Sequence, residues 1–201
     1  MSGRRVLRGR LRLTADGWVV GIPRVPSPNA DARSDVVSAY SLENPEISLI
    51  VLHNISLPPN HFGGGDILKL FTNTLNPGAH PEYPALARFK VSAHFVIRRN
   101  GRLIQSVPCR RRAWHAGVSQ WQGRSRCNDF SVGIELEGAD RTPYTARQYR
   151  SLNRLLDCLC QHYPIAAVTG HRVIAPDRKT DPGPAFDPSR LQTPRGVAVK
   201  I

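Results

Sequence analysis

Ile47-Ser-Leu-Ile-Val-Leu-His53 is a short, continuous apolar run that ends in a histidine. A run of this length and composition is typical of a strand that is buried on both faces of a sheet. In α/β sheets, residues at the ends of such strands line the crevice in which ligands bind. The run therefore predicts a central buried strand that carries His53 to the edge of a functional cleft.

The segments that follow extend the predicted sheet. Val91–Arg98 and Arg102–Val107 flank Asn100-Gly101, and an Asn-Gly pair between two apolar runs is the strongest short-range signal for a hairpin. Phe130–Glu137 alternates apolar and polar residues, which predicts a strand with one apolar and one polar face. Ala166–Thr169 is predicted to be a short last strand.

One long amphipathic helix is predicted before that last strand. Thr145-Ala-Arg-Gln148 is a capping box, which opens a helix, and Pro164 closes it. The apolar stripe of this helix consists of Tyr149, Leu152, Leu156, Leu159 and Tyr163. The predicted fold is therefore α/β, a single domain with a central mixed β-sheet flanked by helices.

The length of 201 residues is typical of one domain with a sizeable core. We assign residues 16–192 to this domain, residues 1–15 to a basic, flexible N-terminal extension and residues 193–201 to a C-terminal tail. Within the domain, residues 57–90 are rich in Gly and Pro and carry one short helix over 66–71. A long, poorly regular insertion of this kind has the profile of a mobile lid over an active site.

The composition predicts a cytoplasmic protein. No apolar stretch approaches the ~20 residues that a membrane-spanning helix needs, so no membrane partner is expected. Residues 1–12 contain arginines with no apolar segment behind them, which argues against a secretory signal. The cysteines lack Cys-x-x-Cys spacing, which favours reduced thiols over disulfides or a zinc cluster. They are Cys109, Cys127, Cys158 and Cys160.

The net charge is +13, and 24 arginines with four lysines supply the 28 basic residues. Such a surface attracts polyanions, among which nucleic acid is the obvious candidate. Apart from residues 4–12 and 110–112, however, the basic residues are scattered, and aromatic residues do not alternate with them. We therefore favour a solvated basic surface that also steers a small anionic substrate, and we disfavour nucleic acid as a partner.

His53, His171 and Asp181 are the candidate metal ligands. Each histidine follows a predicted strand, and Asp181 stands ten residues beyond His171, before Pro-Gly-Pro. Taken alone, a histidine at a strand end is more often a structural residue, and an aspartate before proline is a common turn former. Together, two imidazoles and one carboxylate are a sufficient ligand set for a catalytic Zn²⁺.

Glu135 and Glu137 are alternative candidates for a general base. They project from the same face of their strand, because side chains alternate with a period of two. A carboxylate beside bound Zn²⁺ can accept the proton of an attacking water molecule. Lys179, two residues before Asp181, supplies a positive charge where an oxyanion would develop. These features predict a zinc hydrolase, with the choice between the two glutamates open.

Six blocks of sequence occur in one order between Asp16 and about Arg190. They are Val51-Leu-His-Asn-Ile-Ser-Leu-Pro58, Val91-Ser-Ala-His94, Ala113-Trp-His-Ala-Gly117, Arg126-Cys-Asn-Asp-Phe-Ser131, Gly133-Ile-Glu-Leu-Glu-Gly138 and His171 with Lys179-Thr-Asp-Pro-Gly183. This pattern resembles the type 2 N-acetylmuramoyl-L-alanine amidases, which are related to peptidoglycan-recognition proteins. The resemblance is to their cytoplasmic branch, which hydrolyses 1,6-anhydro-N-acetylmuramoyl peptides in peptidoglycan recycling.

The resemblance implies a zinc amidase with the Zn²⁺ held by His53, His171 and Asp181. It implies that Glu135 is the general base and that Lys179 stabilises the tetrahedral oxyanion. An aspartate at position 181 fits the cytoplasmic branch, because extracellular relatives often have cysteine there.

The resemblance also implies a small muropeptide as the partner, bound by Asn54, Trp114 and Arg126, with Lys90 as a further contact to stem-peptide carboxylates. Relatives commonly have arginine where this chain has Lys90, and a lysine cannot bind a carboxylate with two parallel hydrogen bonds. A receptor that binds such fragments without cutting them is the competing interpretation. The presence of both Glu135 and Lys179 argues against it.

Overall fold

The computed structural model describes residues 9–33 and 47–201. The strands of its main sheet are β2 (Leu49–Ile55), β3 (Phe95–Ile97), β4 (Leu103–Gln105), β8 (Ser131–Glu137), β9 (Ala167–Gly170) and β10 (Ala198–Lys200). Two short antiparallel pairs are formed by β1 (Ala30–Ala32) with β5 (Arg111–Ala113) and by β6 (Gln120–Trp121) with β7 (Arg124–Ser125). The helices are α1 (Asp66–Phe71), α2 (Tyr83–Leu86), α3 (Ala146–His162) and α4 (His171–Ile174), with 3₁₀ turns η1 (Pro77–Ala79), η2 (Cys127–Asp129) and η3 (Pro188–Arg190).

The main sheet has the strand order β10-β9-β2-β8-β3-β4 within the described residues. The β3–β4 hairpin is antiparallel, and every other neighbouring pair in this sheet is parallel. The sheet is therefore mixed, as the sequence predicts, and the hairpin at Asn100-Gly101 is confirmed. Since β2 and β8 are central and parallel, their carboxyl ends meet at one edge of the sheet, where the predicted site residues lie.

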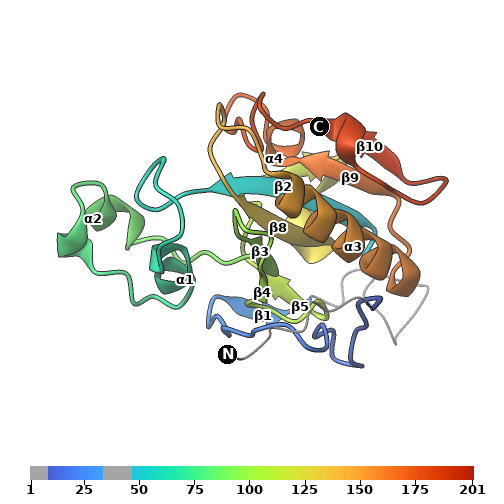
Figure 1. Ribbon diagram of the computed structural model, residues 1–201, viewed down its shortest axis with the longest axis horizontal. Helices are drawn as coiled ribbons and strands as arrows, with labels where there is room; N and C mark the ends of the chain where they lie inside the picture. Colours follow the sequence, from blue (N-terminus) through green and yellow to red (C-terminus); the bar gives the residue numbers. More distant parts are fainter. Residues whose placement is uncertain (1–8, 34–46) are drawn as a thin grey trace, which may run out of the picture.

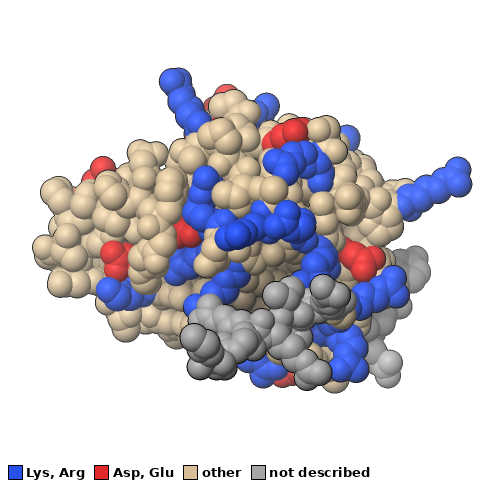
Figure 2. Space-filling view, viewed as in Figure 1, with Lys and Arg blue, Asp and Glu red and all other residues tan. Residues whose placement is uncertain are grey.

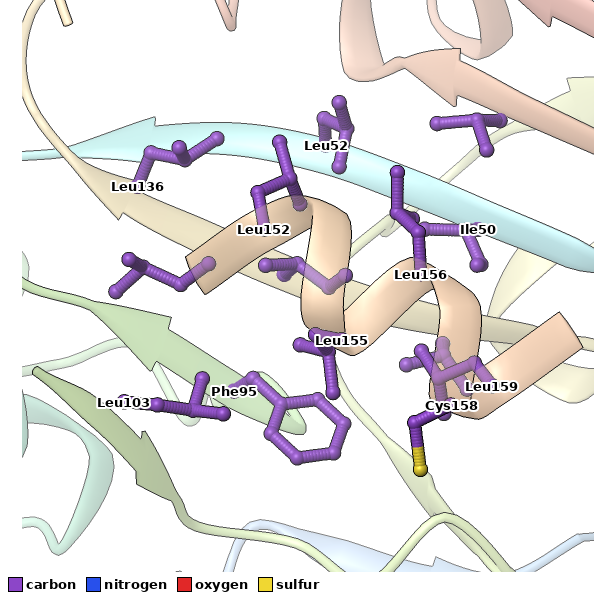
Figure 3. Close-up of a cluster of buried hydrophobic side chains, with 14 of the residues drawn as sticks. Ile50, Leu52, Phe95, Leu103, Leu136, Leu152, Leu155, Leu156, Cys158 and Leu159 are labelled. Carbon is purple, nitrogen blue, oxygen red and sulfur yellow. The ribbon is translucent and has the colours of Figure 1, made fainter. Parts of the chain in front are cut away.

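Helix α3 covers one face of this sheet (Figure 1). The capping box is confirmed: the Thr145 hydroxyl oxygen accepts from Gln148 N at 3.1 Å, and Gln148 Oε1 accepts from Thr145 N at 3.1 Å. Leu152 and Leu156 point towards β2, where Ile50 and Leu52 lie next to them (Figure 3). Burying each leucine contributes about 1.5–3 kcal/mol. Among the described helices, none has both the length and the apolar character needed to cross a bilayer.

The insertion over residues 57–90 contains α1, η1 and α2 and projects from the body as a lobe (Figure 1). The predicted helix over 66–71 is confirmed, whereas α2 was missed. An apolar cluster that includes Phe71 and Tyr83 packs the lobe against Val96 of β3, and the Tyr83 hydroxyl donates to Asp66 at 2.8 Å. The insertion is thus more regular than its composition indicates, and its motion as a lid stays a prediction.

The predicted boundaries of the domain need correction at both ends. Residues 9–15 pack on the domain: Leu11 belongs to the main core, and Arg154 donates to the Gly9 carbonyl at 2.7 Å. The start of the predicted extension, residues 1–8, lies outside the described residues. Likewise, residues 193–201 include β10, which pairs with β9 at the sheet edge. Both segments join the domain through tertiary contacts that local sequence patterns do not report.

The polar face predicted for β8 is present, but it is buried. All seven residues of this strand are buried, including Glu135 and Glu137. Loop residues around His115 cover this polar face, because Gly133 leaves room for the ring. The two glutamates therefore lie inside the molecule, where a carboxylate needs hydrogen-bond partners or a chemical role.

Candidate active site

The three candidate metal ligands converge at the carboxyl ends of β2 and β9. His53 Nδ1 lies 3.0 Å from His171 Nδ1 and 2.9 Å from Asp181 Oδ2, and the His171–Asp181 separation is 3.1 Å. Both histidines are buried, and Asp181 is partly exposed. The structure thus brings together the three residues that the sequence singled out.

A turn brings Asp181 back to the start of α4. Arg172 N donates to the Asp181 carbonyl at 3.0 Å, and Lys179 N donates to the Ala175 carbonyl at 3.1 Å. Gly183 has φ +81°, and a Cβ there would lie 2.3 Å from Asp140 Cα. A glycine is therefore required after Asp181-Pro182 to place this carboxylate against the two imidazoles.

The donor set fits a divalent cation. His171 Nε2 lies 3.1 Å from the Ala116 carbonyl oxygen, which can only accept, so the ring proton is on Nε2 and the Nδ1 lone pair faces the site. Burial lowers the pKa of His53 to about 4, which keeps this imidazole neutral at pH 7. Uncharged imidazole nitrogens beside a carboxylate oxygen are the ligands that Zn²⁺ takes in catalytic sites.

Glu135 and Glu137 differ sharply in their surroundings. The Glu137 oxygens accept hydrogen bonds from Gly63 N at 2.7 Å, Arg98 Nη1 at 2.8 Å and Arg99 N at 3.0 Å. Glu135 Oε2 is buried and has no hydrogen-bond partner among the described residues. Burial, with a smaller effect from the negative charge of Asp181, raises the pKa of Glu135 well above its ordinary value. Glu137 therefore forms a structural ion pair with Arg98. Glu135, in contrast, has a carboxyl oxygen that is free to take part in chemistry.

A cavity of about 440 Å³ opens beside the three ligand atoms. Its wall includes the predicted residues Asn54, Trp114, Glu135, Lys179 and the three candidate ligands, together with Ile55, Phe71, Val91, Ser92, His115, Asp140, Arg178 and Thr180. Asn54 is held by Asp140, whose Oδ1 accepts from Asn54 Nδ2 at 2.7 Å. The wall is rich in polar groups, as expected for a site that binds a polar substrate.

Arg126 and Lys90 do not belong to this cavity wall. The Arg126 side chain is 67% exposed and forms an ion pair with Asp129 at 2.9 Å. Lys90 is exposed beside Val91. The structure therefore brings together all but these two of the predicted site residues.

Five polar residues of the cavity wall were not predicted from the sequence: Ser92, His115, Asp140, Arg178 and Thr180. Arg178 donates to the carbonyls of Ala116, at 3.1 Å, and Val118, at 2.5 Å. His115 lies in the motif Ala113-Trp-His-Ala-Gly117. Its place beside Trp114 was the only feature of the sequence that pointed to it. Contacts made between separate loops carry no periodic pattern, which explains these omissions.

Comparison with known proteins identifies the family. The family model described as N-acetylmuramoyl-L-alanine amidase matches residues 43–184. The 1,6-anhydro-N-acetylmuramyl-L-alanine amidase AmpD of Escherichia coli is 55% identical over 182 residues, covering 90% of this chain and 95% of the relative. The protein of the same name from Haemophilus influenzae is 45% identical, covering 85% and 90%.

Solved structures agree with this assignment. A crystal structure of a selenomethionine derivative of AmpD superposes with a TM-score of 0.82 at 54% identity, covering 89% of this chain and 96% of that one. The amidase AmiD of Escherichia coli, in complex with anhydro-N-acetylmuramic acid-L-Ala-D-γ-Glu-L-Lys, superposes with a TM-score of 0.55 at 27% identity, covering 81% of this chain and 64% of that one. The chain therefore belongs to the N-acetylmuramoyl-L-alanine amidase family and is an amide hydrolase.

Proposed function

We propose that this protein is a zinc-dependent amidase of peptidoglycan recycling. It hydrolyses the amide between the lactyl group of 1,6-anhydro-N-acetylmuramic acid and the L-alanine of a stem peptide. The observation that carries the proposal is the convergence of two imidazole nitrogens and one carboxylate oxygen beside Glu135, whose Oε2 lacks a partner. The AmpD relatives that cover most of this chain are named for the same substrate.

His53, His171 and Asp181 would hold the Zn²⁺. When bound, this ion supplies Lewis acidity, which polarises the amide carbonyl group and lowers the pKa of a water molecule. The histidines contribute no charge, so the net charge of the ligand set is that of one carboxylate. With Zn²⁺ bound, the site would carry a net positive charge, which suits developing negative charge.

Glu135 moves the proton. It stands in register with His53 on the neighbouring strand, at the wall of the cavity. Its carboxylate takes a proton from the attacking water molecule and then delivers it to the amide nitrogen as the C–N bond breaks. Burial raises the pKa of Glu135, and a raised pKa makes its carboxylate a stronger acceptor for the proton of the water molecule.

Lys179 supplies the charge that the oxyanion needs. It lines the cavity on the turn between α4 and Asp181. Its charge acts to lower the pKa of both Glu135 and His53, so it lies within electrostatic reach of the reacting atoms. A fixed positive charge at this distance stabilises a tetrahedral intermediate more than it stabilises the neutral amide.

The rest of the cavity orients the muropeptide. Asn54, fixed by Asp140, offers an oriented amide group, and the Trp114 ring offers an apolar wall. Basic side chains spread over the molecular surface, with a concentration near the middle of the face in Figure 2, and they attract the carboxylates of a stem peptide. We propose that Arg126 and Lys90 act on those carboxylates from outside the cavity wall.

The proposal includes the cytoplasm as the compartment. All four cysteines are free thiols, which is the form that a reducing compartment maintains. Three of them are buried, and burial raises the pKa of Cys109 to about 12. Their thiols are therefore inert parts of the core.

The test is to incubate the purified protein with 1,6-anhydro-N-acetylmuramoyl-tripeptide and to identify the products by mass spectrometry. We expect the free tripeptide and the free anhydro sugar acid. The tripeptide alone serves as the control and should stay intact. Intact substrate after incubation with zinc-saturated protein would overturn the proposal and favour a receptor that binds without cutting.

A further inference from the structure

The dipeptide His115-Ala116 contacts both histidines of the candidate metal site on the side away from the ligand atoms. His115 Nδ1 lies 3.0 Å from His53 Nε2, and the Ala116 carbonyl oxygen lies 3.1 Å from His171 Nε2. We propose that this dipeptide sets the tautomer of both histidines, with His115 as a positioning residue for His53. The proposal rests on the zinc site proposed above and adds a determinant of its affinity.

The proton positions around His53 follow from a chain of hydrogen bonds. Ser131 Oγ lies 2.5 Å from the Cys127 carbonyl oxygen, which can only accept, so the hydroxyl proton points there. The Ser131 oxygen then accepts from His115 Nε2 at 3.3 Å. With its one proton on Nε2, neutral His115 has a lone pair on Nδ1 and accepts from His53 Nε2. His53 Nδ1 is left unprotonated, facing His171 and Asp181.

The same dipeptide fixes the second histidine through its backbone. The Ala116 carbonyl accepts from His171 Nε2, so the lone pair of His171 Nδ1 also faces the site. Asn128 Oδ1 anchors both residues of the dipeptide, because it accepts from His115 N at 3.1 Å and from Ala116 N at 2.8 Å. One asparagine thus places the acceptors for both imidazoles.

The His115 ring occupies the space that a side chain on Gly133 would fill. This glycine lies in the middle of buried strand β8, where glycine weakens a strand. A Cβ on Gly133 would lie 2.4 Å from His115 Cγ, a distance that side chains do not reach. Strand β8 therefore has a glycine, which stabilises a strand poorly, at the position where the His115 ring packs beside His53.

Orienting partners of this kind matter for metal sites, because they hold the ring and keep the correct nitrogen free. Loss of such a partner typically weakens metal affinity by about 10–100-fold. A purely structural role for His115 would change the stability of the fold and leave both the tautomer of His53 and the affinity for Zn²⁺ unchanged. Tautomer and affinity are therefore the readouts.

The first measurement is a long-range ¹H–¹⁵N spectrum of the metal-free wild-type protein at pH 7.5, which identifies the protonated nitrogen of each imidazole. We expect the proton on Nε2 in His53, His115 and His171. A proton on Nδ1 of His53 or His171 would overturn the proposal. This spectrum tests the dipeptide even if the wild-type protein takes up no Zn²⁺, an outcome that would refute only the proposed zinc chemistry.

The second measurement is Zn²⁺ affinity by competition with a chromophoric chelator. His115→Phe keeps a ring in the space above Gly133 and removes the acceptor, so we expect an affinity about 10–100-fold below that of the wild type. His115→Asn places Oδ1 two bonds from Cβ, where histidine has Nδ1, and should restore most of the affinity. His162→Phe, on the exposed end of α3, is the control and should bind like the wild type.

Equal Zn²⁺ affinity of His115→Phe and the wild type would contradict the proposal. So would a loss in His115→Asn as large as that in His115→Phe, because the acceptor would then be irrelevant. Circular dichroism of each metal-free variant separates these results from a failure to fold. If His115→Phe does not fold, the wild-type spectrum and His115→Asn still decide the question.

Discussion

His53 of β2 and Glu135 of β8 are register partners on adjacent parallel strands. The pairing places a candidate metal ligand and a buried carboxyl group at one level of the sheet, on the face that the cavity opens to. Because both strands are central, neither side chain depends on a mobile loop for its position. The relative position of these two side chains is thus set by the sheet itself.

Replacing Glu135 with glutamine removes the proton acceptor and preserves the shape of the side chain. We expect turnover to fall by about 10²–10⁴-fold, the usual contribution of general acid–base catalysis. Bound zinc, measured by inductively coupled plasma mass spectrometry, should stay at one equivalent because the ligands are untouched. Near-normal turnover in this variant would rule out Glu135 as the base.

Glu137→Gln is the matched variant on the same face of β8. Its carboxylate is bound by Arg98 and by two backbone N–H groups, so the change leaves a largely buried guanidinium without its ion-pair partner. We expect the free energy of unfolding to fall by about 3 kcal/mol. Urea unfolding measures this loss, while turnover per folded molecule should stay within a few-fold of the wild type. Lost turnover with unchanged stability would show that Glu137, and not Glu135, is the general base.

Lys179→Met removes the positive charge from the cavity and keeps most of the side-chain volume. We expect kcat to fall by about 10²–10³-fold, as when one stabilising group of an oxyanion is lost. KM should change little, because the charge acts mainly on the transition state. Steady-state kinetics checks both values, and a change confined to KM would show that Lys179 only binds substrate.

The metal-free protein should lose stability in mild acid. Burial, aided by the Arg33 charge, lowers the pKa of His94 to about 3, and burial lowers the pKa of His53 to about 4. An unfolded chain binds these protons near pH 6.5, whereas the folded chain does not, so the free energy of unfolding falls as the pH decreases from about 6.5 towards 4. Each such histidine contributes up to about 1.4 kcal/mol per pH unit. Urea unfolding at pH 7.5, 6.0 and 5.0 measures the slope, and constant stability over this range would contradict the account.

Local patterns predicted the parts of the molecule that local contacts determine. The hairpin at Asn100-Gly101 and the cap at Thr145 depend on residues that are close in sequence, and both are present in the structure. The site residues His53 and His171 were found for the same reason: the apolar run before each one predicts a strand that leads to the histidine.

Features that depend on distant contacts were missed or misjudged. Leu11 joins the core only through segments far along the chain, and strand β10 forms only because the β9 edge is free to pair. The period-two pattern of β8 indicated a polar face, but it could not show that loop residues around His115 bury that face. The distinct roles of Glu135 and Glu137 likewise follow from the partners that reach each carboxylate, which the strand pattern does not contain.

The most direct test of the account is turnover of 1,6-anhydro-N-acetylmuramoyl-tripeptide before chelation, after chelation and after reloading with one equivalent of Zn²⁺. The account predicts that release of the free tripeptide stops when the metal is removed and returns when zinc is restored. Full turnover by protein shown to be metal-free would contradict it, because His53, His171 and Asp181 would then form a site that the reaction does not need.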